Sequence, residues 1–435
     1  MLDDDPIVIV GMAIEAPGQV DSAASYWDLL VSGREALSAF PKDRSWPVAD
    51  LLAPRDGFKA IHDLGGFLSG ATLFDPEFFS ISPREATAMD PQQRVALRVT
   101  WRALEHAGIN PDDLNGHDVG CYVGASVAGY GAGLPLFSDL TGHLMSGKSL
   151  GVISGRIGYL LGLAGPALTV DTSCSSALTA MHTAIQALRA GDCTMALAGG
   201  VHVMGSPGDF AEFAKQHALS DDGHCRPYSA QASGTIWAEG AGMFVLERRS
   251  AARAAGRTEL AELRASCLNQ DGRSNGLTAP SGAAQERLFT RALATAGASA
   301  GDIGMIEGHG TGTVLGDRTE LNALANTYGA TAPGRGAVLG SVKSNLGHAQ
   351  AAAGALGLAK VIVSASHGVI PPTLHASVPS PEICWEKQGL RLCAHATPWP
   401  AVDGTRLAAV SAFGMSGTNA HMVLALPDRP EDLVA

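Results

Sequence analysis

Cys174 lies in the stretch VDTSCSSALTA (170–180), between a β-branched run and a series of small residues. From Ser175 onward apolar residues follow a helical period as far as Gly191, which predicts Cys174 in the first turn of a helix. Unpaired N–H groups and the dipole at a helix start favour a thiolate over a thiol. A packed core thiol is the alternative, and this stretch alone leaves both open.

Two other stretches contain histidines in unusual surroundings. In EGHGTGT (307–313), His309 lies between glycines after a predicted strand, and glycine allows backbone and substrate to approach closely. In VKSNLGH (342–348), Lys343 precedes His348 by five residues, and a small-residue helix is predicted to follow. Each histidine alone is compatible with a structural role.

A fourth loop, AFGMSGTNAH (412–421), is suited to bringing backbone N–H groups into a site. All four loops follow predicted strands, which core packing alone does not explain. From PIVIV (6–10) onward, short apolar strands alternate with Ala-rich helices, so the sequence predicts an α/β fold with buried sheets. Residues 83–107 have helical spacing and predict one helix, closed by Gly108.

A weak internal repeat predicts a duplicated core. DVGCYVG (118–124) and DIGMIEG (302–308) are each followed by a strand, a loop and a helix. We place the division near residues 250–257, in the charged, Ala-rich stretch ERRSAARAAGR. The predicted halves are residues 1–252, with Cys174, and 253–435, with the two histidines, and together they form one domain.

Composition limits the classes of partner. The chain has 435 residues, 46% of them hydrophobic and 17% charged, as expected of a compact globular protein. Its net charge of −12 disfavours nucleic acid and acidic membranes as partners. Seven cysteines without a CxxC pair indicate reduced thiols. Because the N-terminus is acidic and no apolar run is long enough to span a bilayer, we expect a cytoplasmic protein.

Other motifs have little support. GHLMSGKS (142–149) matches the phosphate-loop pattern, but the preceding residues do not form a buried strand and no magnesium-binding Asp follows one convincingly. The loop after the first strand lacks the dinucleotide-binding GxGxxG. A zinc site made of Cys174, His309 and His348 has no supporting ligand spacing. The sequence therefore predicts neither a nucleotide nor a metal.

Taken together, the motifs resemble a known family. VDTSCSSA, EGHGTGT, VKSNLGHAQAAAG and AFGMSGTNAH resemble, in this order, the four signature loops of β-ketoacyl synthases of the polyketide synthase type. LFDPEFFSISPREATAMDPQQR (73–94) resembles another long hallmark of that group. The similarity covers residues 5–425. Within the family, the chain looks most similar to stand-alone ketosynthases of mycobactin- and nocobactin-type siderophore pathways.

The resemblance implies a thiolase fold, a duplicated five-layered α-β-α-β-α sandwich that is usually a homodimer. It also implies roles for individual residues. Cys174 would be the acyl-accepting nucleophile, and His309 and His348 would be the decarboxylation pair, with Lys343 and Glu320 in the polar network behind them. The backbone N–H groups of Cys174 and Phe413 would form the oxyanion hole. Thr311, Thr313 and Gly414 would lie beside the phosphopantetheine.

Three positions differ from the commoner family pattern. Ser173 and Gly308 stand where Ala is usual, and Arg318 stands where Pro is usual. We expect these differences to affect the shape of the pocket and to leave the chemistry intact.

The implied reaction is a decarboxylative Claisen condensation between acyl-Cys174 and a malonyl thioester. It needs no bound cofactor, because both substrates are carried on the phosphopantetheine of acyl carrier protein. The sequence shows no acyltransferase elbow and no carrier motif, and MLDDDPIVIVG resembles a natural start. We therefore expect a free-standing enzyme that meets carrier protein, acyltransferase and ketoreductase partners in trans, and makes a short β-ketoacyl thioester for siderophore synthesis.

Three alternative functions would need other residues at these positions. A thiolase would need a second cysteine in a C-terminal Gly-rich loop, and neither Cys384 nor Cys393 lies in one. A chain-initiating ketosynthase would have Asn in place of His348. A non-catalytic partner or chain-length factor typically lacks the cysteine, which is present here.

One further prediction concerns docking. Carrier proteins of this family are usually acidic, as is this chain, so docking would need a local basic patch. Arg94, Arg98 and Arg102 recur every four residues of a predicted helix and would share one face. We expect either a carrier-docking surface or an ordinary solvated helix face there.

Overall fold

The computed structural model describes residues 5–135, 137–329, 336–400 and 406–427. Within these residues, one mixed sheet has 11 strands in the order β10-β8-β7-β12-β13-β6-β1-β5-β4-β2-β3, and β9 pairs with β11 separately. The strands are β1 (Ile7–Glu15), β2 (Val119–Gly124), β3 (Ala167–Val170), β4 (Met195–His202), β5 (Gly240–Arg248), β6 (Ala261–Gln270), β7 (Ile303–Glu307), β8 (Val338–Gly340), β9 (Val369–Ile370), β10 (Arg391–Leu392), β11 (Thr397–Pro398), β12 (Arg406–Phe413) and β13 (Thr418–Leu426).

The sheet contains the same arrangement of five strands twice. In the N-terminal half β3, β2 and β4 are parallel, and β5 and β1 continue the sheet antiparallel. In the C-terminal half β8, β7 and β12 are parallel, and β13 and β6 continue it antiparallel. The halves join where β1 pairs with β6. The repeated sequences at 118–124 and 302–308 form β2 and β7, which occupy equivalent places, so the repeat reflects this duplication.

Helices cover both halves of the sheet and also separate them. The α-helices are α1 (Ala23–Val31), α2 (Val48–Leu52), α3 (Pro83–Ala88), α4 (Pro91–His106), α5 (Leu144–Lys148), α6 (Gly151–Leu161), α7 (Ser176–Ala190), α8 (Gly208–Lys215), α9 (Arg249–Ala254), α10 (Gly282–Ala296), α11 (Val314–Thr327), α12 (Lys343–Leu346), α13 (Ala353–Ser366) and α14 (Trp385–Gln388). Helix α9 connects β5 to β6, and the division we propose after residue 252 falls within it.

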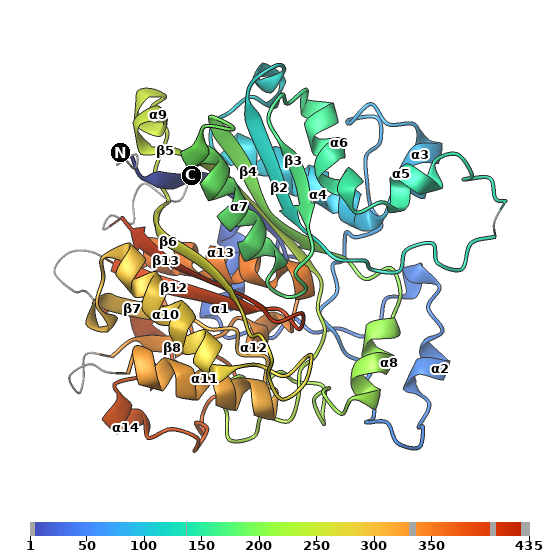
Figure 1. The fold of residues 1–435 in the computed structure, drawn as a ribbon. Helices are drawn as coiled ribbons and strands as arrows, with labels where there is room; N and C mark the ends of the chain where they lie inside the picture. Colours follow the sequence, from blue (N-terminus) through green and yellow to red (C-terminus); the bar gives the residue numbers. More distant parts are fainter. Residues whose placement is uncertain (1–4, 136, 330–335, 401–405, 428–435) are drawn as a thin grey trace.

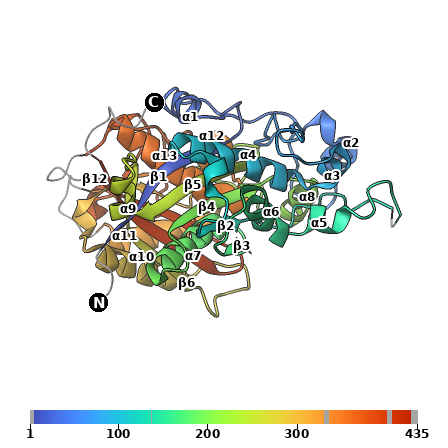
Figure 2. The same ribbon diagram turned by 90° about the horizontal axis from the view of Figure 1, so that it is seen from above.

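Helices α7 and α13 form the central layer, because both contact strands of both halves. Helices α4 and α6 pack on the N-terminal strands, and α10 and α11 form the outer layer on the C-terminal side (Figures 1 and 2). The five layers of the predicted thiolase fold are thus present. Every residue of α13 is buried between the two halves of the sheet, and all of them except Lys360 are small or apolar.

The single helix predicted over 83–107 is wrong. The structure has two helices, α3 and α4, separated at Met89 and Asp90. Asp90 caps α4 by accepting a hydrogen bond from the N–H of Gln92, and Pro91 occupies the first helical position. Proline fixes the backbone for a helix start but disfavours helical geometry in the residue before it, so a new helix begins here.

The arginine face of α4, for which a docking surface and a solvated helix face were both open, makes contacts within the chain. Arg98 donates to both carboxylate oxygens of Glu15, at 3.0 and 2.7 Å, and Arg102 pairs with the same carboxylate. The guanidinium of Arg94 lies over the ring of Tyr130, 6.0 Å from its centroid. These arginines are engaged within the chain, so they do not form a free basic patch for an acidic partner.

The phosphate-loop match at 142–149 has no phosphate-loop structure around it. Residues 144–148 form the short helix α5, and no strand lies between β2 and this helix in the described part of that segment. The Nζ of Lys148 donates to the carbonyl of Gly131. A search of the described residues also finds no helix whose length and apolar character would suffice to cross a membrane.

Candidate active site

The four loops singled out in the sequence follow the carboxyl ends of four strands. Cys174 follows β3, His309 follows β7, Lys343 follows β8, and Phe413 ends β12. The loops meet although β3 and β8 lie far apart in the strand order. The ring centroids of His309 and His348 are 5.3 Å apart, and those of His309 and Phe413 are also 5.3 Å apart. The predicted groups therefore belong to one site.

Contacts of the 413–417 turn bring the cysteine loop into this site. The backbone N–H of Met415 donates to the sulfur of Cys174. A Cβ on Gly414 would lie 2.1 Å from the carbonyl oxygen of Thr172, so glycine is needed for this approach. The hydroxyl of Ser416 donates to the same carbonyl at 3.4 Å. Sequence reasoning did not identify the Met415 contact, because its donor is a backbone N–H and not a side chain.

Cys174 sits just before α7 rather than in its first turn. The helix begins at Ser176, and Ser173 has a φ of +57°, which turns the chain sharply out of β3. The N–H of Ser173 donates to the Asp171 carboxylate at 2.9 Å, and its carbonyl accepts the Ser176 hydroxyl at 2.6 Å. Ser173, at a position where the family usually has Ala, thus forms a tight turn that presents the partly exposed Cys174.

Of the two states left open for Cys174, the structure favours the thiol. Burial raises the pKa of the Cys174 thiol to about 11, although the positive charge of Lys343 and the N–H of Met415 act in the opposite direction. Loss of hydration outweighs the effect of a helix start, whose favourable contribution is small. At neutral pH the resting group is a thiol, so its proton must leave during any nucleophilic reaction.

Both histidines are neutral. Burial lowers the pKa of His309 and of His348 well below the usual range, and the charge of Lys343 lowers both further. The backbone N–H of Gln350 donates to Nδ1 of His348 at 3.2 Å. In the neutral ring the proton is then on Nε2, which is left as a donor. The backbone of His348 is fixed by hydrogen bonds with Ile236 and Ala238.

Two buried carboxylates on α11 hold the His309 loop. Glu320 accepts the N–H groups of His309 and Gly310 at 2.8 and 2.9 Å, and the hydroxyl of Tyr228 at 2.9 Å. Asp317 accepts the N–H groups of Gly312 and Tyr228 at 3.1 and 2.7 Å.

Burial raises the pKa of both carboxyls, that of Asp317 to about 7. Sequence reasoning predicted Glu320 in this network but missed Asp317 and Tyr228. The three-residue spacing of Asp317 and Glu320, which places both on one helix face, was the available signal for Asp317.

Lys343 is buried at the start of α12, close to the predicted network. Burial lowers its pKa, while the negative charges of Glu307 and Glu320 oppose this shift. Glu307 itself forms a fully buried ion pair with Lys360 of α13, at 2.7 Å, and accepts the N–H of Val342 at 2.6 Å. Glu307 and Lys360 thus fix the residue before Lys343, a support that the sequence did not suggest.

The remaining predicted residues lie on the same loops. The hydroxyls of Thr311 and Thr313 are 2.9 Å apart and partly exposed, beside the exposed side chains of Val314 and Leu315. Arg318, where the family usually has Pro, is on the outer face of α11 with its Nε 3.0 Å from Glu382. The Arg318 side chain is thus exposed and paired with Glu382.

Gly308, the third unusual position, has a clear structural reason. A Cβ built on Gly308 would lie only 1.9 Å from the hydroxyl oxygen of Tyr228. The hydroxyl occupies the space that an alanine methyl would fill, and it uses this position to bond Glu320. Gly308 and Tyr228 thus form a matched pair behind His309.

We predict that Gly308→Ala destabilises the protein by about 1–3 kcal/mol, because the new methyl overlaps the Tyr228 hydroxyl. Adding Tyr228→Phe removes that hydroxyl, so the double variant should recover most of the loss. Urea unfolding of the parent, both single variants and the double variant measures the coupling, expected to be at least about 1 kcal/mol.

Gly155→Ala in α6 is the matched control, because a Cβ there meets nothing within 4 Å. Strictly additive effects of Gly308→Ala and Tyr228→Phe would show that the two side chains do not share this space.

Comparison with known proteins agrees with the motifs. The sequence model of the β-ketoacyl synthase N-terminal domain matches residues 4–252, and that of the C-terminal domain matches residues 260–377. Among curated relatives, the spectinabilin polyketide synthase system protein NorA' of Streptomyces orinoci is 51% identical over 99% of this chain and 12% of its own length. Mycoketide-CoA synthase of Mycobacterium tuberculosis is 48% identical over 97% of this chain and 10% of its own length. The chain thus spans about a tenth of these relatives.

Solved structures agree with the fold. The ketosynthase from module 6 of the bacillaene synthase of Bacillus subtilis 168 superposes with a TM-score of 0.89 at 38% identity, over 97% of this chain and 72% of that one. The oxazolomycin ketosynthase domain of Streptomyces albus JA3453 gives 0.89 at 37% identity, over 97% and 74% of the two chains. The chain therefore belongs to the β-ketoacyl synthase family, as a condensing ketosynthase domain of the type found in modular polyketide synthases.

Proposed function

We propose that this chain joins an acyl group held on Cys174 to a malonyl unit by decarboxylative Claisen condensation. The observation that supports this most is the convergence of a cysteine and two neutral histidines at the ends of β3, β7 and β8. A neutral imidazole keeps one ring N–H, and this N–H can donate a hydrogen bond to a developing oxyanion.

In the first half-reaction the Cys174 sulfur attacks the carbonyl carbon of an acyl thioester. The carbon–sulfur bond to the carrier phosphopantetheine breaks, and the cysteine proton leaves with the departing thiol. Backbone N–H groups of Cys174 and Phe413 are proposed to stabilise the tetrahedral oxyanion. Splitting the condensation in this way replaces one difficult step with two easier ones.

In the second half-reaction a malonyl thioester replaces the departed carrier. Nε2–H of His348 and the ring N–H of His309 donate to its thioester oxygen. The carboxylate leaves as CO₂, and its electron pair forms an enolate that these donors stabilise. The enolate carbon attacks acyl-Cys174, the sulfur leaves as a thiolate that takes a proton from water, and a β-ketoacyl thioester remains on the carrier.

The surrounding residues are proposed to position the two thioesters. Thr311, Thr313 and Gly414 line the path of the phosphopantetheine, and Glu320 with Lys343 supports the histidine loops. Partial exposure of the two threonines beside Val314 and Leu315 supports an opening at this edge. No bound cofactor is required for this sequence of steps.

A homodimer is also proposed. Strand β3 is last in the sheet order, so one edge has no strand partner among the described residues. Large apolar side chains on this strand and on the helix packed against it are exposed: Leu168 of β3 and Tyr159 of α6. Free strand edges and apolar patches of this kind are typical of interfaces. Pairing of two β3 strands would cover them, which sedimentation equilibrium would report as twice the chain mass.

The resemblance noted in the sequence also indicates a product and a pathway. We propose a short, acetoacetyl-type product made from separate acetyl and malonyl carrier proteins, passed to a reductase in a siderophore pathway in the cytoplasm. The basis is the resemblance to stand-alone ketosynthases, whereas the relatives named above are polyketide synthases much longer than this chain.

Reconstitution tests this proposal. The chain is incubated with malonyl carrier protein and a series of acyl carrier proteins from acetyl to long-chain, and products are read by intact mass. We expect acetyl to give the fastest β-ketoacyl formation. A strict preference for long chains would contradict the short product, and no condensation with any carrier would contradict the proposed function itself.

A further inference from the structure

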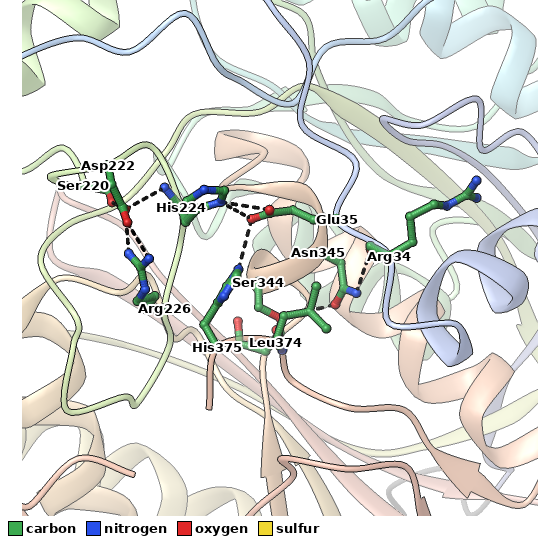
Figure 3. A network of polar contacts seen from close by, with 11 residues as sticks. Arg34, Glu35, Ser220, Asp222, His224, Arg226, Ser344, Asn345, Leu374 and His375 are labelled. Carbon is green, nitrogen blue, oxygen red and sulfur yellow. Dashed lines mark hydrogen bonds and ion pairs between the residues drawn. The ribbon is translucent and has the colours of Figure 1, made fainter. Parts of the chain in front are cut away.

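Three polar side chains outside the proposed catalytic site converge on one point. Glu35 lies in the loop after α1, His224 lies between α8 and β5, and His375 follows β9. Nδ1 of His224 is 2.9 Å from Oε1 and 2.8 Å from Oε2 of Glu35, and Nε2 of His375 is 3.3 Å from the same Oε1. Figure 3 shows both imidazoles directed at this carboxylate from two separate segments of the chain.

We infer that these residues form a binding site for a divalent transition-metal ion, of which Zn²⁺ is the representative. One ligand atom from each residue lies within 4.8 Å of the other two. Two imidazole nitrogens and one carboxylate oxygen are a favourable ligand set for zinc, copper or nickel, whereas Mg²⁺ and Ca²⁺ prefer oxygen ligands.

The two distances to the Glu35 carboxylate fit a four-coordinate ion with little change, and the two imidazole nitrogens lie within 4.8 Å of each other. Ligand bonds of about 2.0–2.1 Å at tetrahedral angles place ligand atoms about 3.3 Å apart. The His375–Glu35 distance already has this value, and the His224–Glu35 pair would open by about 0.5 Å. The three side chains are 20–33% exposed, so an ion can enter and a water can complete the coordination.

The loop that contains His224 is held independently of any ion. Asp222 accepts two hydrogen bonds from Arg226, at 2.6 and 2.5 Å, and a third from the N–H of His224 at 3.3 Å. This pair appears beside the site in Figure 3. Asp222 is thereby occupied with Arg226, so Glu35 is the carboxylate that faces both imidazoles.

Each ligand is next in sequence to a residue that contacts a catalytic loop. Arg34 accepts the side-chain N–H of Asn345 at 3.1 Å, and Leu374 donates to the hydroxyl of Ser344 at 2.9 Å. Ser344 and Asn345 belong to the segment that runs from Lys343 to His348. These contacts also appear in Figure 3.

The third ligand, His224, is next in sequence to a residue that contacts the loop of His309. Cys225, next to His224, donates from its sulfur to the carbonyl of Thr311 at 3.2 Å. A bound ion would therefore tie together the three segments that support the His309 and His348 loops, without touching the reacting atoms. We assign it a stabilising role.

Zinc titration of the full-length, chelator-treated chain tests the site. We expect one saturable Zn²⁺ per chain by calorimetry, a rise in Tm on binding, and no comparable response to Mg²⁺. Co²⁺ should give the visible absorption of a low-coordinate nitrogen–oxygen site without a thiolate charge-transfer band. Glu35→Gln, His224→Ala and His375→Ala should each weaken binding at least about tenfold.

Matched variants separate this site from other possible ligands. His117→Ala removes an exposed histidine elsewhere, Cys384→Ser removes the exposed thiol, and Cys174→Ala removes the catalytic one; all three should leave Zn²⁺ affinity unchanged. Glu35→Gln keeps the side-chain shape, so it provides a result even where a histidine variant misfolds.

Two results would overturn the assignment. One is binding that is lost in Cys174→Ala or Cys384→Ser but retained in Glu35→Gln, which would place the ion on a thiol. The other is binding only at millimolar zinc. This result would mean that the two imidazoles and the carboxylate are joined by hydrogen bonds and do not form a metal site.

Discussion

Replacing Cys174 with Ala is expected to abolish condensation, lowering its rate by at least about 10⁴-fold. We expect no other group at the site to form the acyl thioester, because the nearby histidines serve as donors and Cys225, which contacts the Thr311 carbonyl, is buried. Intact-mass spectrometry after incubation with an acyl carrier protein should show one acyl group on the parent chain and none on Cys174→Ala.

The control is Cys384→Ser. Cys384 is exposed, so it is open to reagents, but it lies at the start of the short helix α14 and belongs to none of the four loops that form the site. This variant should be acylated at Cys174 like the parent. Acylation that persists in Cys174→Ala, or disappears in Cys384→Ser, would refute the assignment of the nucleophile.

The sequence identified the catalytic loops because glycine-rich turns after apolar strands leave a recognisable pattern. EGHGTGT and AFGMSGTNAH contain glycines at places of close approach, and the structure explains two of them. Gly308 faces the Tyr228 hydroxyl, and Gly414 faces the carbonyl of Thr172. The repeat at 118–124 and 302–308 likewise revealed the duplication, since the same strand recurs in the same place in each half.

The properties that depend on contacts between distant segments could not be predicted. The raised pKa of Cys174 results from burial by other loops, which a helix-start argument does not include. The support of Glu320 by Tyr228 joins residues 92 positions apart. The proposed metal ligands are farther apart still, so no local spacing indicates them. The break between α3 and α4 was, by contrast, readable from DP at residues 90–91.

Loss of either histidine is expected to affect one half-reaction much more than the other. His309→Ala or His348→Ala should slow decarboxylation of malonyl carrier protein by about 10²–10³-fold, as removal of one oxyanion-hole donor does. Each imidazole supplies an N–H to the oxygen on which the enolate charge develops. Acylation of Cys174 forms no enolate, so its rate should change far less.

His182→Ala is the matched control for this experiment. His182 lies on α7, the helix that follows Cys174; its pKa is lowered by burial, and its Nδ1 lies 2.9 Å from the Ser266 hydroxyl. Removing this imidazole shows how much the rate of decarboxylation falls when a partly buried ring is lost but both donors at the site remain. Decarboxylation should remain near the parent rate in His182→Ala. Decarboxylation at the parent rate in His348→Ala, or equal losses in both half-reactions, would show that the histidines support the fold and do not stabilise the enolate.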